Sequence, residues 1–206
     1  MIIMRDEDLK NLVSLTMENS QDIDEHLLTL FALTVSMKPK TIIELGVRSA
    51  RSTYAFLLGA SQVGARVISC DINDPQPSIP MSDDLKSRWS FHKKDALDFL
   101  ENDFPSLYQG GIVYIDDWHT GDHVRKELEL IDRFIEPDDM VLLHDLMYGN
   151  SQPQYRSVEN APGQWASGGP YKPISELSLS KWEYATIPRC NGMTLLRKKA
   201  GRVKND

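Results

Sequence analysis

The sequence TIIELGVRSARSTYAFLLGA, residues 41–60, passes from an apolar strand pattern to a helical pattern through a single glycine, Gly46. Thr41–Leu45 places apolar side chains on both faces, which is typical of a strand inside a parallel sheet. A helical pattern, Arg51–Ala60, follows within a few residues. Because α/β proteins bind ligands beyond the carboxyl ends of their strands, the turn around Gly46 is a candidate binding site.

The same alternation of strand and helix patterns extends along the chain on both sides of this stretch. Two helices are predicted within residues 1–38, with Ser20 as a cap between them and Lys38-Pro39 at the end of the second. We expect an α/β fold, a three-layer sandwich in which helices cover both faces of a mostly parallel sheet. The further predicted strands are Arg66–Cys70, Trp89–His92, Gly111–Ile115 and Met140–Leu146, and the further helices are Asp95–Glu101 and Val124–Ile135.

The C-terminal part of the chain has a different pattern. Trp182–Ile187 and Met193–Arg197 are strand patterns joined by a short connection that contains Asn191-Gly192. This dipeptide is a hairpin signal, so the last two strands are predicted to be antiparallel neighbours. Residues 148–173 are rich in Gly, Pro, Ser, Asn and Gln and are predicted to form a long loop that acts as a substrate lid.

Length and charge exclude several classes of protein. The 206 residues, 23.4 kDa, have the size of a single domain spanning residues 1–206. The chain has 23 Lys and Arg against 30 Asp and Glu, a net charge of −7, and its basic residues cluster only near the C-terminus, which argues against a nucleic-acid binder. No apolar run reaches the ~18 residues of a membrane span. No signal-peptide pattern is found, and the two cysteines are isolated, so we expect a cytoplasmic protein.

Acidic residues lie at or just beyond the carboxyl ends of the first three predicted strands. In a dinucleotide site the first turn presents backbone amides to a pyrophosphate, which the carboxylate of Glu44 would repel. Glu44 therefore favours a ligand with cationic groups, such as the methionine portion of S-adenosylmethionine, over NAD. Asp71 is placed to accept hydrogen bonds from both ribose hydroxyls, with a helix cap or a turn residue as the alternative. Asp95 is placed to accept from an adenine amino group, with helix capping as the alternative.

The fourth and fifth strand patterns lead directly into acids and imidazoles. The first continues as Asp116-Asp117-Trp118-His119 and the second as His144-Asp145. Burying such groups is costly unless they bind one another, a metal or a substrate. Asp116, His144 and Asp145 offer oxygen and nitrogen ligands from adjacent strand ends, which suits a divalent cation. His119 and His123 are an alternative metal pair, although the Glu of a His-Glu-x-x-His motif is absent.

Together these motifs resemble a class I S-adenosylmethionine-dependent methyltransferase, from Thr41 to about Gly149 and again in the terminal hairpin. The nearest family by pattern is the cephalosporin hydroxylase/rhamnosyl O-methyltransferase family, with catechol-type O-methyltransferases as more distant relatives. The segment HTGDHVRKEL, residues 119–128, is similar to that family's segment after the fourth strand. The chain departs from the pattern at Ala50, where the family has a second glycine, and at Leu146, where catechol enzymes have an Asn.

The resemblance implies a Rossmann-like methyltransferase fold with S-adenosyl-L-methionine as cofactor and Mg²⁺ as metal ion. It makes Asp116 and Asp145 metal ligands and puts His144 where the nearer family has Glu. It puts His119 where catechol enzymes have a basic lysine. The implied cofactor-binding residues are Glu44, Gly46, Val47, Ser52, Asp71, Ile72, Asp95, Ala96, Asp116 and Trp118.

The leading hypothesis is an O-methyltransferase that acts on a hydroxyl of a sugar or small secondary metabolite. In it, the hydroxyl oxygen attacks the sulfonium methyl group. His119 is the predicted general base, with helix capping or a hydrogen bond to Asp116 as its alternative role, and Asp116 and Asp145 complete the catalytic set. A non-catalytic S-adenosylmethionine-binding partner in a biosynthetic complex and a NAD-binding oxidoreductase are the alternative functions. The acceptor, and whether the chain forms a homo-oligomer, are left open.

Overall fold

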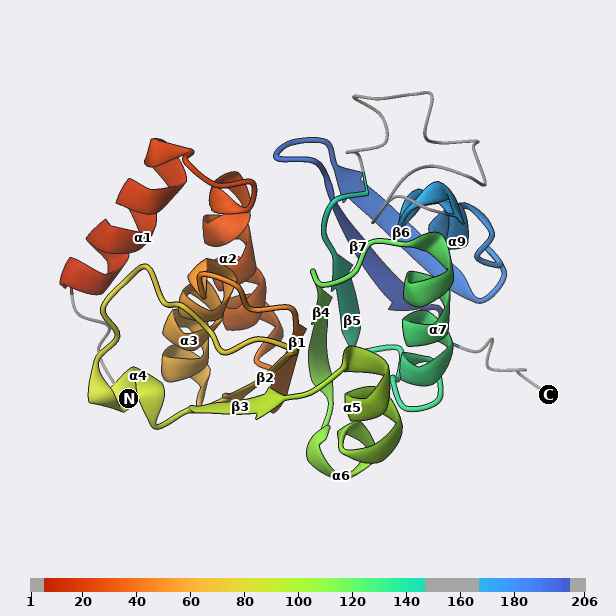
Figure 1. Ribbon diagram of the computed structural model, residues 1–206, viewed down its shortest axis with the longest axis horizontal. Coiled ribbons are helices and arrows are strands. Elements are labelled where there is room, and N and C mark those ends of the chain that lie inside the picture. Colours follow the sequence, from red (N-terminus) through yellow and green to blue (C-terminus); the bar gives the residue numbers. More distant parts are fainter. Residues whose placement is uncertain (1–5, 147–166, 201–206) are drawn as a thin grey trace.

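One sheet of seven strands forms the centre of the computed structural model, which describes residues 6–146 and 167–200 (Figure 1). The strands are β1 (Thr41–Leu45), β2 (Arg66–Asp71), β3 (Trp89–Lys93), β4 (Gly111–Ile115), β5 (Met140–Leu143), β6 (Trp182–Ile187) and β7 (Met193–Lys198). Their order across the sheet is β3-β2-β1-β4-β5-β7-β6. β1 to β5 pair in parallel, and β7 runs antiparallel to both β5 and β6. The predicted mostly parallel sheet with an antiparallel C-terminal hairpin is confirmed.

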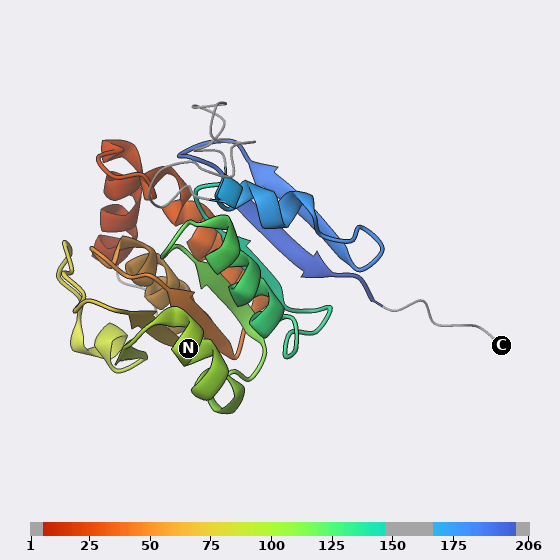
Figure 2. The same cartoon turned by 45° about the vertical axis from the view of Figure 1, so that its right-hand side comes forward.

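Helices cover both faces of the sheet, which confirms the predicted three layers (Figure 2). Successive strand residues point to opposite faces, so Ile42 packs with the first helical layer and Ile43 with the second. The first layer contains α1 (Asp6–Glu18), α2 (Leu27–Met37), α3 (Arg51–Val63) and α4 (Asp83–Lys86). The second contains α5 (Ala96–Asn102), α6 (Phe104–Leu107), α7 (Gly121–Ile131) and α9 (Tyr171–Ser175).

The strand order reverses at the border between β1 and β4, because the chain builds outward to β3 before it returns to the centre. Ligands of open α/β sheets bind at such a switch point, beyond the carboxyl ends of the strands. Three backbone hydrogen bonds just past the strand ends hold the segments together here. They join Gly46 N to Cys70 O (2.9 Å), Asp116 N to Leu45 O (2.8 Å) and His144 N to Ile115 O (3.0 Å).

Several predicted boundaries are wrong by a few residues. β5 ends at Leu143 instead of Leu146, because Asp145 adopts a positive φ of 61° that turns the chain. α7 begins at Gly121 instead of Val124, since the Thr120 side chain caps it by accepting from the His123 amide. The same helix ends at Ile131 instead of Ile135.

The connection between α1 and α2 also differs from the prediction, because Ser20 does not cap a helix. Its backbone N–H and that of Gln21 both donate to the Asp24 carboxylate, each over 2.9 Å. Asp24 belongs to a short 3-10 helix, η1 (Asp24–His26), and its side chain is fully buried against Arg51. The connection is therefore organised around a buried ion pair to α3.

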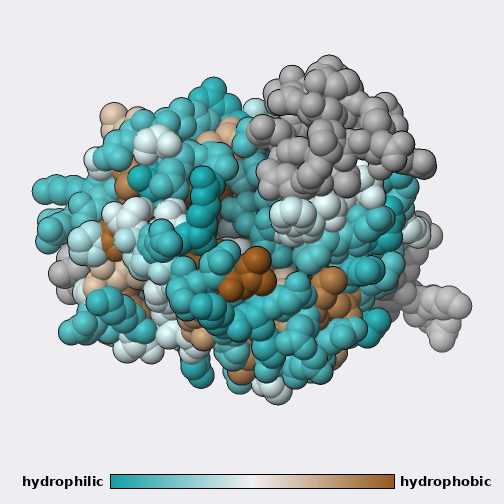
Figure 3. Space-filling model, in the orientation of Figure 1, coloured by the Kyte–Doolittle hydropathy of each residue, from teal (hydrophilic) through white to brown (hydrophobic). Residues whose placement is uncertain are grey.

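The predicted lid, residues 148–173, lies mostly outside the described residues. In the part that is described, α9 begins at Tyr171, so the predicted loop end at Pro173 is wrong. Among the described helices, none has the length and hydrophobicity that crossing a bilayer requires. The face seen in Figure 1 is largely hydrophilic, and its hydrophobic patches are small and separate (Figure 3).

Candidate active site

A cavity of about 630 Å³ opens at the switch point, beyond the carboxyl ends of β1, β2 and β4. Most of the predicted cofactor residues form its wall: Gly46, Val47, Asp71, Ile72, Asp95, Ala96, Asp116 and Trp118. The same wall includes residues that the sequence analysis did not assign to the cofactor: Arg48, Cys70, Asn73, Lys94, Asp117 and His123.

Gly46 is the point at which the turn after β1 approaches the end of β4. Its φ is +87°, and a Cβ built on it would lie 2.2 Å from the Asp116 carbonyl oxygen. Any side chain here would therefore separate the two strand ends that form the cavity. Ala50, which replaces the second glycine of the motif, still adopts a left-handed φ of 56° just before α3. This is a conformation that glycine adopts more readily than alanine.

Glu44 does not line the cavity, contrary to the prediction that it meets the ligand. Its side chain is fully buried, and its carboxylate accepts hydrogen bonds from Ser52 (2.7 Å), Thr53 (2.7 Å) and Ser69 (2.6 Å). Burial raises the pKa of Glu44 to about 7, although the three hydroxyl donors act in the opposite direction. Ser52 is likewise buried beneath the wall. Both residues therefore lie in the interior, next to the turn after β1, and do not line the cavity.

Asp71 and Asp95 lie on the wall and also make local backbone contacts. Oδ2 of Asp71 accepts from the amides of Val47 (2.9 Å) and Arg48 (3.3 Å), and Oδ1 accepts from Asn73 (2.8 Å). Asp95 caps α5 through Oδ1, so the capping alternative holds for this oxygen. A carboxylate oxygen has more than one lone pair, so both side chains can still accept from a ligand in the cavity.

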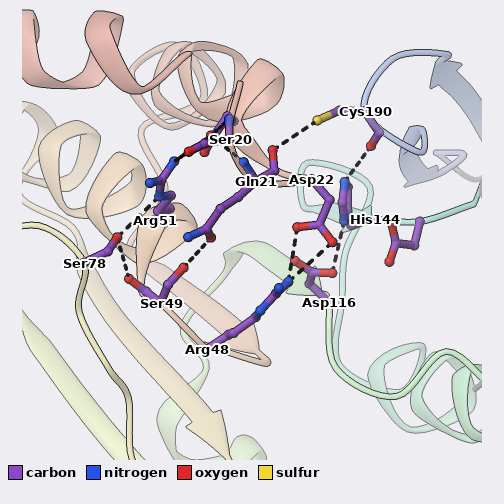
Figure 4. A network of polar contacts seen from close by, with 12 residues as sticks. Ser20, Gln21, Asp22, Arg48, Ser49, Arg51, Ser78, Asp116, His144 and Cys190 are labelled. Carbon is purple, nitrogen blue, oxygen red and sulfur yellow. Dashed lines mark hydrogen bonds and ion pairs between the residues drawn. The ribbon is translucent and has the colours of Figure 1, made fainter. Parts of the chain in front are cut away.

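The N-terminal segment around η1 is tied across the turn after β1 (Figure 4). Gln21 accepts from Ser49 (2.6 Å), Arg48 pairs with Asp22 (3.2 Å), and the Cys190 thiol lies 3.8 Å from the Gln21 carbonyl oxygen. These contacts join residues far apart in sequence, so local sequence patterns do not indicate them. They bring the N-terminal segment and the β6–β7 connection to the same edge as Asp116 and His144.

Four side chains from the ends of β4 and β5 form an acid–imidazole cluster: Asp116, His119, His144 and Asp145. His144 Nδ1 lies 3.1 Å from Asp116 and 3.3 Å from Asp145, and its Nε2 donates to the Cys190 carbonyl oxygen over 2.8 Å. His119 Nε2 lies 3.5 Å from Asp116 and 3.4 Å from Asp145. The structure thus brings together all the residues predicted to be catalytic or metal-binding.

The charges of this cluster shift one another's pKa values. Burial lowers the pKa of His144, but Asp116 and Asp145 outweigh it and raise that pKa to about 9. The pKa of His119 is also raised, because the neighbouring carboxylates outweigh burial. Burial acts to raise the pKa of Asp116, yet the two imidazoles hold it well below its ordinary value. The raised pKa favours the protonated form of His119, which cannot act as a general base until it loses that proton.

His119 and His123 do not share a site, so the alternative metal pair is wrong. His119 precedes α7 and faces Asp116 and Asp145, whereas His123 lies in the first turn of α7 and faces the other way. His123 Nε2 lies 3.1 Å from Asp117 and 3.6 Å from Glu127. We refer to Asp117, His123 and Glu127 as the α7 cluster.

Comparison with protein families finds a match over half of the chain. The family model of a methyltransferase domain matches residues 43–146, from β1 to the residues that follow β5. A search of curated proteins finds no match.

Solved structures with the same fold include proteins with bound S-adenosylhomocysteine (SAH). An O-methyltransferase from Bacillus cereus in complex with SAH is 13% identical, with a TM-score of 0.67 over 97% of this chain and 94% of that one. The SAH-bound methyltransferase PaMTH1 of Podospora anserina is 13% identical, with a TM-score of 0.57 over 97% of this chain and 99% of that one.

A third similar structure is MycE, a methyltransferase of the mycinamycin biosynthetic pathway in complex with Mg, SAH and mycinamycin VI. It is 14% identical, with a TM-score of 0.67 over 98% of this chain and 57% of that one. At these identities the three structures show a shared fold. The family match and the shared fold lead to one conclusion: the chain belongs to the methyltransferase domain family and is a class I S-adenosylmethionine-dependent methyltransferase.

Proposed function

We propose that this enzyme transfers the methyl group of S-adenosylmethionine to a hydroxyl oxygen of a small molecule, of the sugar or secondary-metabolite class. One observation carries the proposal: Asp116 belongs to the cavity wall and to the acid–imidazole cluster at once. A cofactor in the cavity and a hydroxyl acceptor at the cluster would therefore meet at Asp116. MycE, with SAH and mycinamycin VI bound, supports a small-molecule acceptor.

The cavity wall offers the groups that this cofactor requires. Asp71 would accept hydrogen bonds from the ribose hydroxyls. Ile72 and Trp118 are 64% and 51% exposed and offer apolar surface to the adenine ring. Arg48 would supply positive charge to the carboxylate of the methionine portion.

Asp116, His144 and Asp145 would hold a divalent cation. One donor atom from each lies within 4.8 Å of the other two. The bond from His144 Nε2 to the Cys190 carbonyl oxygen directs Nδ1 at the two carboxylates, an outer-shell contact typical of metal-binding histidines. When bound, such an ion binds the acceptor oxygen and lowers its pKa. Mg²⁺ is the proposed ion, and Mn²⁺, which accepts imidazole more readily, belongs in the same test.

His119 is the proposed proton acceptor, with one condition from its raised pKa. It lies within 3.5 Å of Asp116 and Asp145, beside the place where the acceptor hydroxyl would bind. Because its pKa is raised above 6.5, His119 must lose a proton before it can accept one. Turnover is therefore expected to rise with pH through a pKa above 6.5.

The test is methyl transfer from isotopically labelled S-adenosylmethionine to a panel of glycosides, polyols and phenols. We expect a methyl ether and one equivalent of SAH per turnover, and loss of activity on chelation that Mg²⁺ or Mn²⁺ restores. Transfer to nitrogen or carbon acceptors alone would contradict the proposed acceptor class. Full activity after exhaustive chelation would contradict the metal and leave Asp116 and Asp145 as direct contacts.

A further inference from the structure

Glu127 on α7 is a buried acid in an apolar environment. Its side chain has no exposed surface and lies on the same helix face as Val124, Leu128 and Ile131, which belong to the second hydrophobic core. Within the described part of the chain, neither carboxylate oxygen accepts a hydrogen bond. The Glu127 carboxylate faces the His123 imidazole as an ion pair, but it accepts no hydrogen bond, so its lone pairs remain available to a ligand.

The two other members of the α7 cluster lie in front of Glu127. His123 is one turn before it on the same helix, with Nε2 3.6 Å from Glu127 Oε1 and 3.1 Å from Asp117 Oδ2. One donor atom from each of the three side chains lies within 4.8 Å of the others. Metal–ligand bonds of about 2.1 Å in a tetrahedron separate neighbouring donor atoms by about 3.4 Å. The two measured distances bracket that value.

An ion at this place would be accessible from the cavity. Asp117 and His123 are part of the cavity wall, whereas Glu127 lies behind them. Three protein ligands would thus hold the ion from one side, and a fourth position would face the cavity. The buried oxygen atoms of Glu127 accept no hydrogen bond within the described residues, and Oε1 faces the wall residue His123.

We propose that Asp117, His123 and Glu127 form a site for a divalent transition-metal ion of the zinc type, distinct from the acid–imidazole cluster. One imidazole nitrogen and two carboxylate oxygens are a ligand set that Zn²⁺ accepts in proteins. Mg²⁺ suits the site less well, because it prefers oxygen ligands and retains several waters. The adjacent residues Asp116 and Asp117 would each serve a different site: Asp116 with the end of β5, and Asp117 with α7. The proposed Zn²⁺ site does not depend on the proposed O-methyltransferase activity.

The test is Zn²⁺ titration by calorimetry on the full chain without an affinity tag and without S-adenosylmethionine. Asp145→Asn serves as the background, because it removes a ligand of the acid–imidazole cluster and Asn tolerates the positive φ of this position. We expect one equivalent of Zn²⁺ to bind in this background. Adding Glu127→Gln is expected to weaken binding by at least about a hundredfold.

Glu129→Gln is the matched control, because Glu129 lies on the same helix with an exposed side chain and should leave Zn²⁺ binding unchanged. Absence of Zn²⁺ binding in the Asp145→Asn protein would overturn the proposal, and so would binding that Glu127→Gln does not weaken. If circular dichroism shows that the Glu127→Gln protein is unfolded, the same titration is made with Asp117→Asn in the Asp145→Asn background. Zn²⁺ binding that Asp117→Asn does not weaken would then overturn the proposal. The ligand-field absorption of bound Co²⁺ gives a second readout of the same variants.

Discussion

The two walls of the cavity, each taken together with the side chains packed behind it, satisfy their acids in different ways. On the wall formed by β1 and β2, the carboxylates of Glu44 and Asp71 accept hydrogen bonds from hydroxyls and backbone amides. On the wall formed by β4, β5 and α7, the acids face imidazoles: Asp116 and Asp145 face His119 and His144, and Asp117 faces His123.

This difference in hydrogen-bond partners indicates that the first wall binds the cofactor and that the second wall takes part in proton transfer. Neutral donors that stay in place give the first wall a fixed shape, which suits recognition of a cofactor. Imidazole–carboxylate pairs hold protons that a substrate or a cation can displace, which suits proton transfer. We therefore expect substitutions on the first wall to change the affinity for S-adenosylmethionine or the free energy of unfolding. Substitutions on the second wall should change turnover.

The largest effect is expected on the second wall, from His119→Ala. Loss of a general base lowers turnover by at least about a hundredfold and up to about 10⁴-fold. The affinity for S-adenosylmethionine should stay within a few-fold, because His119 lies behind the second wall and does not line the cavity itself. Steady-state kinetics with saturating cofactor and calorimetry on the same protein check the two values.

The pH profile separates a base from a structural residue. In the unmodified enzyme kcat should rise with pH as His119 loses its proton, and this limb should vanish in His119→Ala. Asp145→Asn removes a carboxylate that raises the His119 pKa, so any residual limb should move to lower pH. A loss of turnover below tenfold, with the limb retained, would show that the proton leaves through another group.

Glu44→Gln is expected to change stability on the first wall. The pKa of Glu44 is about 7 in the folded protein and near 4.5 when unfolded, so the folded state binds more protons between these values. Stability due to this group is therefore complete below about pH 4.5 and is lost as pH rises through about 7. The shift corresponds to about 3 kcal/mol.

Denaturant unfolding of both proteins from pH 4.5 to 8 measures this effect. The free energy of unfolding of the unmodified protein, relative to Glu44→Gln, should fall across that range. A constant difference would show that Glu44 is ionised in the folded state throughout, and that its hydroxyl donors outweigh burial.

Asp71→Ala is expected to weaken binding on the same wall. Each hydrogen bond to a charged carboxylate is worth about 1.5–3 kcal/mol, so S-adenosylmethionine affinity should fall by at least about tenfold. Asp74→Ala is the matched control, because Asp74 is exposed, pairs with Lys93 and is not part of the wall. Calorimetry that shows equal affinity for Asp71→Ala and Asp74→Ala, with both folds intact, would leave Asp71 as a turn residue.

The smallest effect is expected at the Arg48–Asp22 pair, which crosses from the first wall to the N-terminal segment. Both side chains are substantially exposed, so Asp22→Ala should change the free energy of unfolding by less than about 1 kcal/mol. Arg48→Ala should weaken S-adenosylmethionine binding more than Asp22→Ala does, if Arg48 contacts the cofactor carboxylate. Equal cofactor affinities in the two variants would remove Arg48 from the binding wall.

Local patterns predicted the sheet and most of the cavity wall. Thr41–Leu45 and Gly111–Ile115 have the predicted bounds, because each is a fully buried run between turn residues. Gly46 and Asp71 follow such runs, so the parallel topology alone puts them at one edge. The hairpin at Asn191 was predictable for the same reason, since its turn chemistry is local.

The direction of buried side chains was not predictable from these patterns. Glu44 turns away from the cavity because its three hydroxyl partners come from α3 and β2, and their positions depend on tertiary packing. Glu127 did leave a signal in the sequence: it lies among apolar positions of a helix, four residues after His123. A charged residue on the apolar face of a helix is the pattern to look for.

The central claim, that the first wall recognises S-adenosylmethionine, is tested most directly by calorimetric titration of the unmodified protein with S-adenosylmethionine and with NAD in parallel. The account predicts saturable binding of one S-adenosylmethionine per chain and no binding of NAD at the same concentrations. Saturable NAD binding, or the absence of S-adenosylmethionine binding by the folded protein, would contradict it.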